Sequence, residues 1–103
     1  MNLPRGTLVL VDLEPTQGLA VNDNQRFPLI AVVPVTGTPA QGALYPRLAA
    51  GPSGLIKPST ALVDQVRSID KQRIRQRFGQ VSTAELEAID AGLCLYLGLD
   101  PEA

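Results

Sequence analysis

Two polar side chains that can take part in chemistry, Arg26 and Thr36, stand at the two ends of the longest apolar run in the chain. Residues 29–33 of this run are continuously apolar, which is typical of a strand buried on both faces. A core strand with polar groups at its ends is a rigid support for a site. Arg26 equally fits a solvated loop and Thr36 a turn, so this run alone leaves both interpretations open.

The sequence contains no histidine, and Cys94 is its single cysteine. Catalytic groups based on histidine are therefore excluded, and a zinc site is not expected because zinc sites are built mainly from histidine and cysteine. Any acid or base must be Arg, Lys, Asp, Glu, Tyr or Cys. Cys94 falls in an apolar helical pattern and is expected to be a small core residue. We expect no metal and no cofactor.

The composition predicts one small domain over residues 1–103 with an aliphatic core, because 45% of the residues are hydrophobic and only 4% are aromatic. No apolar run has transmembrane length and no leader pattern opens the chain, so a cytoplasmic protein without membrane contact is expected. The net charge is −1, yet five of the nine basic residues lie between Arg67 and Arg77. This cluster is either a phosphate-facing patch or a solvated face.

The expected elements are several short strands followed by one helix, which favours the α+β class with a small barrel-like sheet covered by the helix. Pro28 and Pro34 predict that the central strand is short, bulged or at an edge. Ser82 and Glu85 form a capping-box pattern at the start of the helix, and Gly98 ends it. In chain order we expect a strand over 7–13, a turn over 14–18, a polar loop over 19–25, strands over 26–36, 43–48 and 59–69, a helical turn over 71–74 capped by Asp70, and the final helix.

Four segments, in this order, resemble a known family. They are RGTLVLVDLEPTQG at 5–18, VPVT at 33–36, GLIKPSTALVDQVRSIDKQRI at 54–74, and the capped helix that ends in LGL at 97–99. In type, order and spacing these segments are similar to those of the MazF/PemK/Kid-type toxins, and the resemblance covers nearly the whole chain. It implies an SH3-like small β-barrel with a C-terminal α-helix, assembled as a homodimer.

The resemblance also implies an activity and partners. Toxins of this family are metal-independent, sequence-specific endoribonucleases of type II toxin–antitoxin systems. They cut single-stranded RNA (messenger, ribosomal or transfer RNA) by attack of a ribose 2′-OH, which inhibits translation and growth. A cognate antitoxin with an acidic C-terminal segment neutralises them.

By position in the family pattern, Arg26 corresponds to the catalytic arginine, which would act as acid/base and phosphate clamp. Thr36, in the Pro-aliphatic-Thr motif, would donate to a phosphate oxygen. Each RNA-contacting candidate has a plainer alternative as a turn or surface-strand residue. These candidates are Gln17, Asn22, Asn24, Lys57, Ser59 and Gln65, with Lys57 and Ser59 expected beside Gln65 on one strand.

The chain departs from the family pattern between Arg26 and Thr36. About a dozen residues, a strand and its loop on typical lengths, are absent there. If the deletion follows Arg26, the catalytic arginine is retained; if it precedes residues 21–24, Arg26 is incidental. A fully extended strand would separate Arg26 from Thr36 by about 33 Å. Two alternatives therefore stay open: a catalytically impaired relative that binds antitoxin or a dimer partner, and an SH3-like interaction domain unrelated to RNA.

Overall fold

The computed structural model describes residues 3–12, 16–22 and 27–99. Seven short strands and two 3₁₀ turns precede one long helix. In chain order these are β1 (Thr7–Val11), β2 (Thr16–Ala20), β3 (Leu29–Thr36), β4 (Arg47–Leu48), β5 (Ser59–Ala61), η1 (Val63–Gln65), β6 (Arg67–Asp70), η2 (Lys71–Arg73), β7 (Ile74–Gln80) and α1 (Thr83–Leu97).

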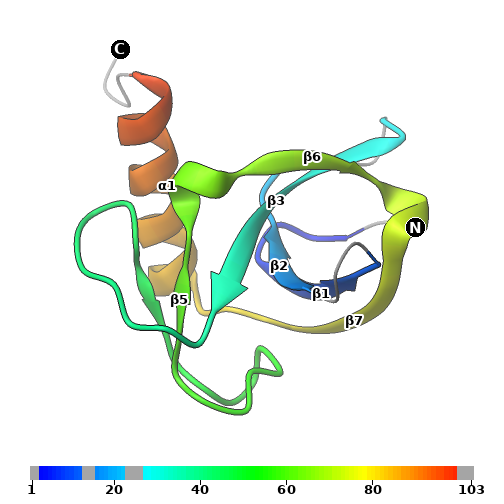
Figure 1. The fold of residues 1–103 in the computed structure, drawn as a ribbon, viewed down its shortest axis with the longest axis horizontal. Coiled ribbons are helices and arrows are strands. Elements are labelled where there is room, and N and C mark those ends of the chain that lie inside the picture. The colour runs from blue at the N-terminus through cyan, green and yellow to red at the C-terminus, as the bar shows by residue number, and fades with distance from the viewer. Residues whose placement is uncertain (1–2, 13–15, 23–26, 100–103) are drawn as a thin grey trace.

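The strands form one curled antiparallel sheet in the order β4-β5-β3-β2-β1-β7, with β6 also paired to β3. Figure 1 shows β6 and β7 curving round the inner strands, while α1 stands at the opposite side. The sheet is thus a half-barrel with one C-terminal helix, which confirms the predicted α+β class and small barrel.

The inner strands β1, β2 and β3 are buried on both faces, as the continuous apolar run predicts. Successive residues alternate between two apolar clusters: Val33 belongs to one, and Ile30 and Val32 belong to the other. Helix α1 covers the first cluster through Ile89, and Ile69 of β6 helps to close the second. The half-barrel therefore has a core on each side of its central strands.

Strand β3 changes its partner at Pro34. On one side it pairs with β6 as far as Val32 and with β5 from Val35 onward. The Pro34 carbonyl accepts a hydrogen bond of 2.8 Å from the Leu62 N–H on this same side. Since the N and C=O of one strand residue point to the same side, the missing Pro34 N–H falls in the gap between β6 and β5. The expected placement at an edge is therefore wrong: β3 is central and continues through Pro34.

The two helical caps predicted from sequence are confirmed. Asp70 accepts a hydrogen bond from the Gln72 N–H at the start of η2. At α1 the Ser82 hydroxyl and the Glu85 carboxylate form the reciprocal capping box, and Gly98 ends the helix in the left-handed conformation with φ of 71°. Cys94, expected in the core, is only half-buried on α1.

The predicted elements differ from the structure in three places. Residues 16–20 form β2 rather than a turn and loop, because Gly18 pairs directly with Pro34 of β3. The expected strand over 59–69 is interrupted by η1, which bridges the step from β5 to β6 beside Pro34. Strand β7 was not expected, since its outward residues are arginines and glutamines and only Ile74 and Phe78 pack against the core clusters. Among the described helices, none is long and apolar enough to cross a membrane.

Docking of α1 on the sheet depends on Ile89, which is fully buried. We expect Ile89→Ala to lower the free energy of unfolding by about 2–5 kcal/mol, because it removes buried methyl groups and leaves a cavity. Urea denaturation followed by circular dichroism measures this change. The control is Glu87→Ala on the exposed face of α1, for which we expect a change within about 0.5 kcal/mol. Equal effects of the two substitutions would contradict this docking.

Candidate functional site

A pocket of about 270 Å³ opens at the C-terminal end of β3. Four segments that are distant in sequence meet there: β2, the end of β3, the loop before β5, and β7. Its lining residues are Gln17, Val35, Thr36, Gly37, Gly54, Leu55, Ile56, Lys57, Ser59 and Phe78. Four of the eight predicted site residues are in this group, namely Gln17, Thr36, Lys57 and Ser59.

Thr36 lies at the last position of β3, where its hydroxyl oxygen accepts a hydrogen bond of 3.2 Å from the Thr38 N–H. A hydroxyl has one proton and two lone pairs, so this contact leaves the proton able to donate into the pocket. The hydroxyl is thereby oriented by the backbone turn that follows the strand. This geometry suits donation to a phosphate oxygen.

The side chain of Lys57 crosses the backbone at Gly37, next to Thr36. A Cβ atom built on Gly37 would lie 2.7 Å from Lys57 Cε and 2.8 Å from Lys57 Nζ. The absence of a side chain at Gly37 thus leaves room for the ammonium group. Ser59 fixes the backbone at Lys57, since its hydroxyl donates a hydrogen bond of 3.0 Å to the Lys57 carbonyl. Ser59 is itself buried, so its contact supports Lys57 more directly than it supports a ligand.

Of the other predicted residues, the two that the structure describes, Asn22 and Gln65, do not line this pocket. The Asn22 side-chain oxygen accepts a hydrogen bond of 3.0 Å from the Ala31 N–H of β3, nine residues away. Gln65 lies in η1, off the strand that was expected to place it beside Lys57 and Ser59. Arg26 and Asn24 lie outside the described residues.

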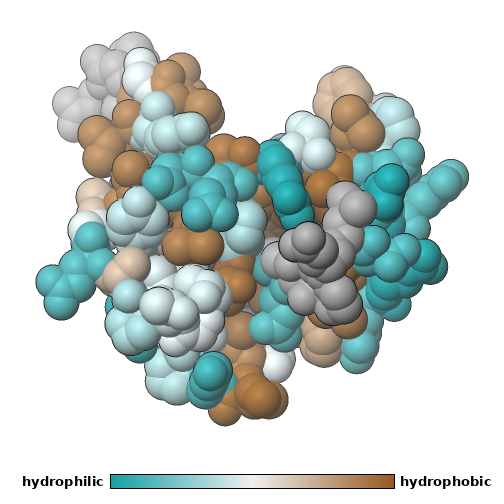
Figure 2. Space-filling view, in the orientation of Figure 1, coloured by the Kyte–Doolittle hydropathy of each residue, from teal (hydrophilic) through white to brown (hydrophobic). Residues whose placement is uncertain are grey.

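Six lining residues were not predicted: Val35, Gly37, Gly54, Leu55, Ile56 and Phe78. Gly54 has φ of +103°, and a Cβ atom there would lie 2.6 Å from the Phe78 Cβ, so only glycine fits this close approach. Ile56 is 97% exposed at the rim. Figure 2 shows apolar side chains running down the middle of the view, between polar flanks. The Gly51-Pro52-Ser53-Gly54 sequence is the local signal for the tight loop that carries Gly54 and Ile56.

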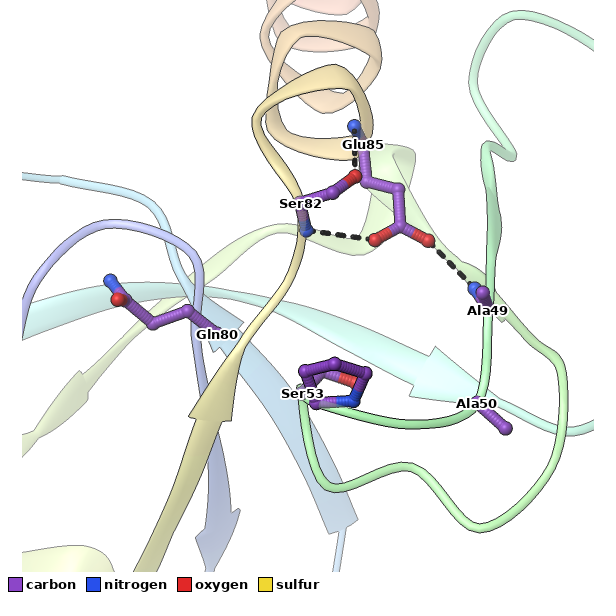
Figure 3. A pocket seen from close by; sticks show the side chains of 7 residues that line it. Ala49, Ala50, Ser53, Gln80, Ser82 and Glu85 are labelled. Atoms are coloured by element: carbon purple, nitrogen blue, oxygen red, sulfur yellow. Dashed lines mark hydrogen bonds between the residues drawn. The ribbon is translucent and has the colours of Figure 1, made fainter.

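A second pocket, of about 370 Å³, lies between residues 49–53 and the start of α1. Figure 3 shows the Glu85 carboxylate at its edge, between the backbone nitrogens of Ser82 and Ala49. Partial burial raises the pKa of the Glu85 carboxyl, but hydrogen bonds from Ala49 and Ser82 lower it more, so the pKa lies below its ordinary value. None of the predicted site residues within the described part of the chain lines this second pocket.

Two ion pairs tie distant segments together away from the first pocket. Arg5 binds Asp90 of α1, and Arg75 of β7 binds Asp12. The Arg75 guanidinium holds the pKa of the Asp12 carboxyl below its usual value. Within residues 3–12, 16–22 and 27–99, no group of His, Cys, Asp or Glu side chains could hold a metal ion.

The first pocket therefore presents a cation, a hydroxyl and an amide from Lys57, Thr36 and Gln17. These groups all donate hydrogen bonds, which is the chemistry that binds a phosphodiester. Phe78 adds an aromatic ring, and Ile56 an exposed apolar side chain, at the same place. A nucleic acid needs both kinds of contact, for its phosphates and for its bases.

Comparison with known proteins agrees with a pocket suited to nucleic acid. A family described as "PemK-like, MazF-like toxin of type II toxin-antitoxin system" matches residues 4–97. Endoribonuclease MazF9 of Mycobacterium tuberculosis is 35% identical over 116 residues, covering 92% of this chain and 96% of the relative. That aligned length exceeds the 103 residues of this chain, so the relative contains residues that this chain lacks.

Solved structures agree in fold. A mycobacterial endoribonuclease in complex with its cognate antitoxin superposes with a TM-score of 0.78 at 25% identity, covering 93% of this chain and 95% of that one. The MazE-MazF complex (Form-II) of Deinococcus radiodurans gives 0.83 at 21% identity, covering 97% and 99%. Together with the match over residues 4–97, this shows that the chain belongs to the PemK-like, MazF-like family of toxins of type II toxin-antitoxin systems.

Proposed function

We propose that this protein is an endoribonuclease toxin that cuts single-stranded RNA without a metal ion and is held inactive by a cognate antitoxin. The observation that carries this proposal is the gathering of Gln17, Thr36 and Lys57, from separate elements, in one pocket at the end of β3. The 35% identity to an endoribonuclease over nearly the whole chain supports the reaction. The RNA inside a cell is the target, so the site of action is the cytoplasm.

The proposed reaction is attack of a ribose 2′-OH on the adjacent phosphorus. The bond from phosphorus to the 5′-oxygen then breaks, which leaves a 2′,3′-cyclic phosphate and a 5′-hydroxyl. Thr36 and Lys57 donate to the non-bridging phosphate oxygens, where negative charge increases in the transition state. Gln17 contacts the RNA beside the cut. Arg26 is the proposed acid/base group by its position in the family pattern, with its guanidinium also able to clamp the phosphate.

The eight residues of β3 span about 23 Å when extended, and Thr36 lies at the end farthest from Leu29. Arg26 precedes β3 in the sequence and Thr36 ends it, so the length of the strand argues against joint action of the two side chains on one phosphate. This length favours the second candidate, a protein that binds antitoxin and a second copy of itself without cutting RNA. We propose a homodimer in either case. Its support is the exposed apolar group at the end of α1, which consists of Leu95, Tyr96, Leu97 and Leu99. An acidic antitoxin tail would complement the basic residues of β6 and β7.

Incubating the purified protein with a long single-stranded RNA in EDTA tests the reaction. We expect cleavage that leaves 2′,3′-cyclic phosphate ends, because none of the proposed groups needs a metal ion. Thr36→Val, which removes the hydroxyl and keeps the shape, is expected to lower the rate about 10- to 100-fold through loss of a hydrogen bond to a charged group.

Three further outcomes complete this test. Thr36→Ser keeps the hydroxyl and should retain most of the activity. If Arg26→Ala abolishes cleavage, Arg26 is the acid/base group; if it does not, the pocket works without it. Antitoxin binding with no cleavage by the unaltered protein would establish the second candidate and reject the first.

The role of Lys57 is tested through Gly37. Gly37→Ala places a methyl group where the Lys57 ammonium lies, so we expect RNA affinity to fall about tenfold, the typical value of one charge-assisted contact. Filter binding with a 2′-O-methyl oligonucleotide, which cannot be cut, measures the affinity. Because the change acts through Lys57, Gly37→Ala should have no further effect in a Lys57→Ala background. Additive effects of the two substitutions would show that Gly37→Ala does not act through Lys57, and an unchanged affinity in Lys57→Ala alone would show that Lys57 does not hold RNA.

A further inference from the structure

The segment of residues 49–57 supplies one wall of the candidate pocket. Its residues 54–57 line the pocket, and Lys57 provides its ammonium group. The segment is folded on itself by two backbone hydrogen bonds, from Gly54 N–H to the Gly51 carbonyl at 2.8 Å and from Gly51 N–H to the Leu55 carbonyl at 3.0 Å. Ser53 and Leu55 are buried. These contacts give the segment one folded conformation, so its attachments to other elements decide where Lys57 lies.

Strand β7 holds the middle of this segment. The Gly79 N–H donates a hydrogen bond of 2.9 Å to the Ser53 carbonyl. A Cβ atom on Gly79 would lie only 1.8 Å from the Pro52 carbonyl oxygen, so the two backbones approach as closely as glycine permits. The neighbouring contact of Gly54 with Phe78 adds a second point of attachment.

Helix α1 holds the start of the segment through Glu85. In a capping box the acidic side chain accepts one hydrogen bond, from the N–H of the N-cap residue. Glu85 does this with Oε1, which accepts from the Ser82 N–H at 2.9 Å. Its other oxygen, Oε2, accepts from the Ala49 N–H at 2.7 Å, as Figure 3 shows. The second contact is not needed for the helix, and it joins α1 to the segment that carries Lys57.

We propose that Glu85 is a positioning residue for RNA cleavage, which acts by fastening the 49–57 segment so that Lys57 lies over Gly37 beside Thr36. Glu85 lines the second pocket and not the candidate RNA pocket, so it does not contact the substrate. This inference rests on the proposed ribonuclease function. It adds a residue from the helix to a site otherwise built from strands and loops.

The direction in which Glu85→Gln changes RNA affinity shows whether Glu85 acts by positioning Lys57 or only through its negative charge. A glutamine still completes a capping box, but its single carbonyl oxygen replaces two carboxylate oxygens that serve Ser82 and Ala49 separately. The substitution also removes a negative charge, which by itself strengthens binding to RNA. We expect the opposite: KM for RNA and the Kd of the uncuttable oligonucleotide rise about tenfold, the typical value of one charged contact.

Two matched controls accompany this variant. Glu87→Gln makes the same charge change on an exposed position of α1 and should leave KM unchanged or slightly lower. Ser82→Ala removes the hydroxyl that accepts from the Glu85 N–H at 3.1 Å, so it weakens the helix start without touching Ala49, and should leave KM unchanged. In a Lys57→Ala background, Glu85→Gln should add nothing to Kd.

The outcomes are distinguishable. If the unaltered protein cuts RNA and Glu85→Gln behaves as Glu87→Gln does, the positioning role is wrong and the ribonuclease function stands. If Ser82→Ala raises KM as much as Glu85→Gln does, the effect belongs to the helix cap and the positioning role is likewise wrong. If the unaltered protein neither cuts nor binds RNA, both proposals fail.

Discussion

The rest of the structure depends on one constraint, the burial of β3 on both faces together with its three strand partners. Alternate residues of β3 enter separate apolar clusters, so neither face of the strand can turn to solvent. Its hydrogen bonds are shared among β2, β5 and β6. Pro34 fits this arrangement because its missing N–H coincides with the step between two of these partners. The strand therefore has one register, which sets the position of Thr36 at its end.

The candidate pocket follows from where β3 ends. Thr36 is placed by the strand, Gln17 by β2 alongside it, and Lys57 by a loop folded against β7 and α1. Each group thus arrives from a different part of the chain, and each is supported by contacts outside the pocket. Glycines at 37, 54 and 79 make this possible, since a side chain at any of them would meet Lys57, Phe78 or Pro52. Close backbone approach is therefore as much a part of the site as its polar groups are.

Local sequence patterns predicted the features that depend on neighbouring residues alone. The continuous apolar run gave a strand buried on both faces, and the spacing of Ser82 and Glu85 gave the helix cap. The family resemblance pointed to Thr36, Gln17, Lys57 and Ser59 as site residues, and the fold brings these four together. Features that depend on tertiary pairing were missed or misplaced. Strand β7 has few residues that favour strands and is formed by its pairing with β1. Gln65 lies in η1 rather than in the expected strand, because η1 bridges the gap between β5 and β6 at Pro34.

The loop contacts could not be predicted for a similar reason. A capping-box glutamate is recognisable from its spacing, but nothing in that spacing says what its second oxygen binds. The Ala49 N–H lies 36 positions away in sequence, and only the folded chain brings it to Glu85. In the same way nothing in the sequence around Gly37 indicates that the Lys57 side chain crosses it.

The position of β7 at the end of the sheet order has a consequence for solubility. An edge strand exposes backbone groups that can pair with a strand of another molecule, which begins aggregation. Here the backbone at Gly79 already pairs with Ser53, and the rest of the edge carries Arg75 and Arg77 with exposed side chains. Charged side chains at an edge oppose such pairing because a neighbouring copy would have to bring like charges together. The basic residues of β7 thus oppose edge-to-edge pairing between copies of this chain.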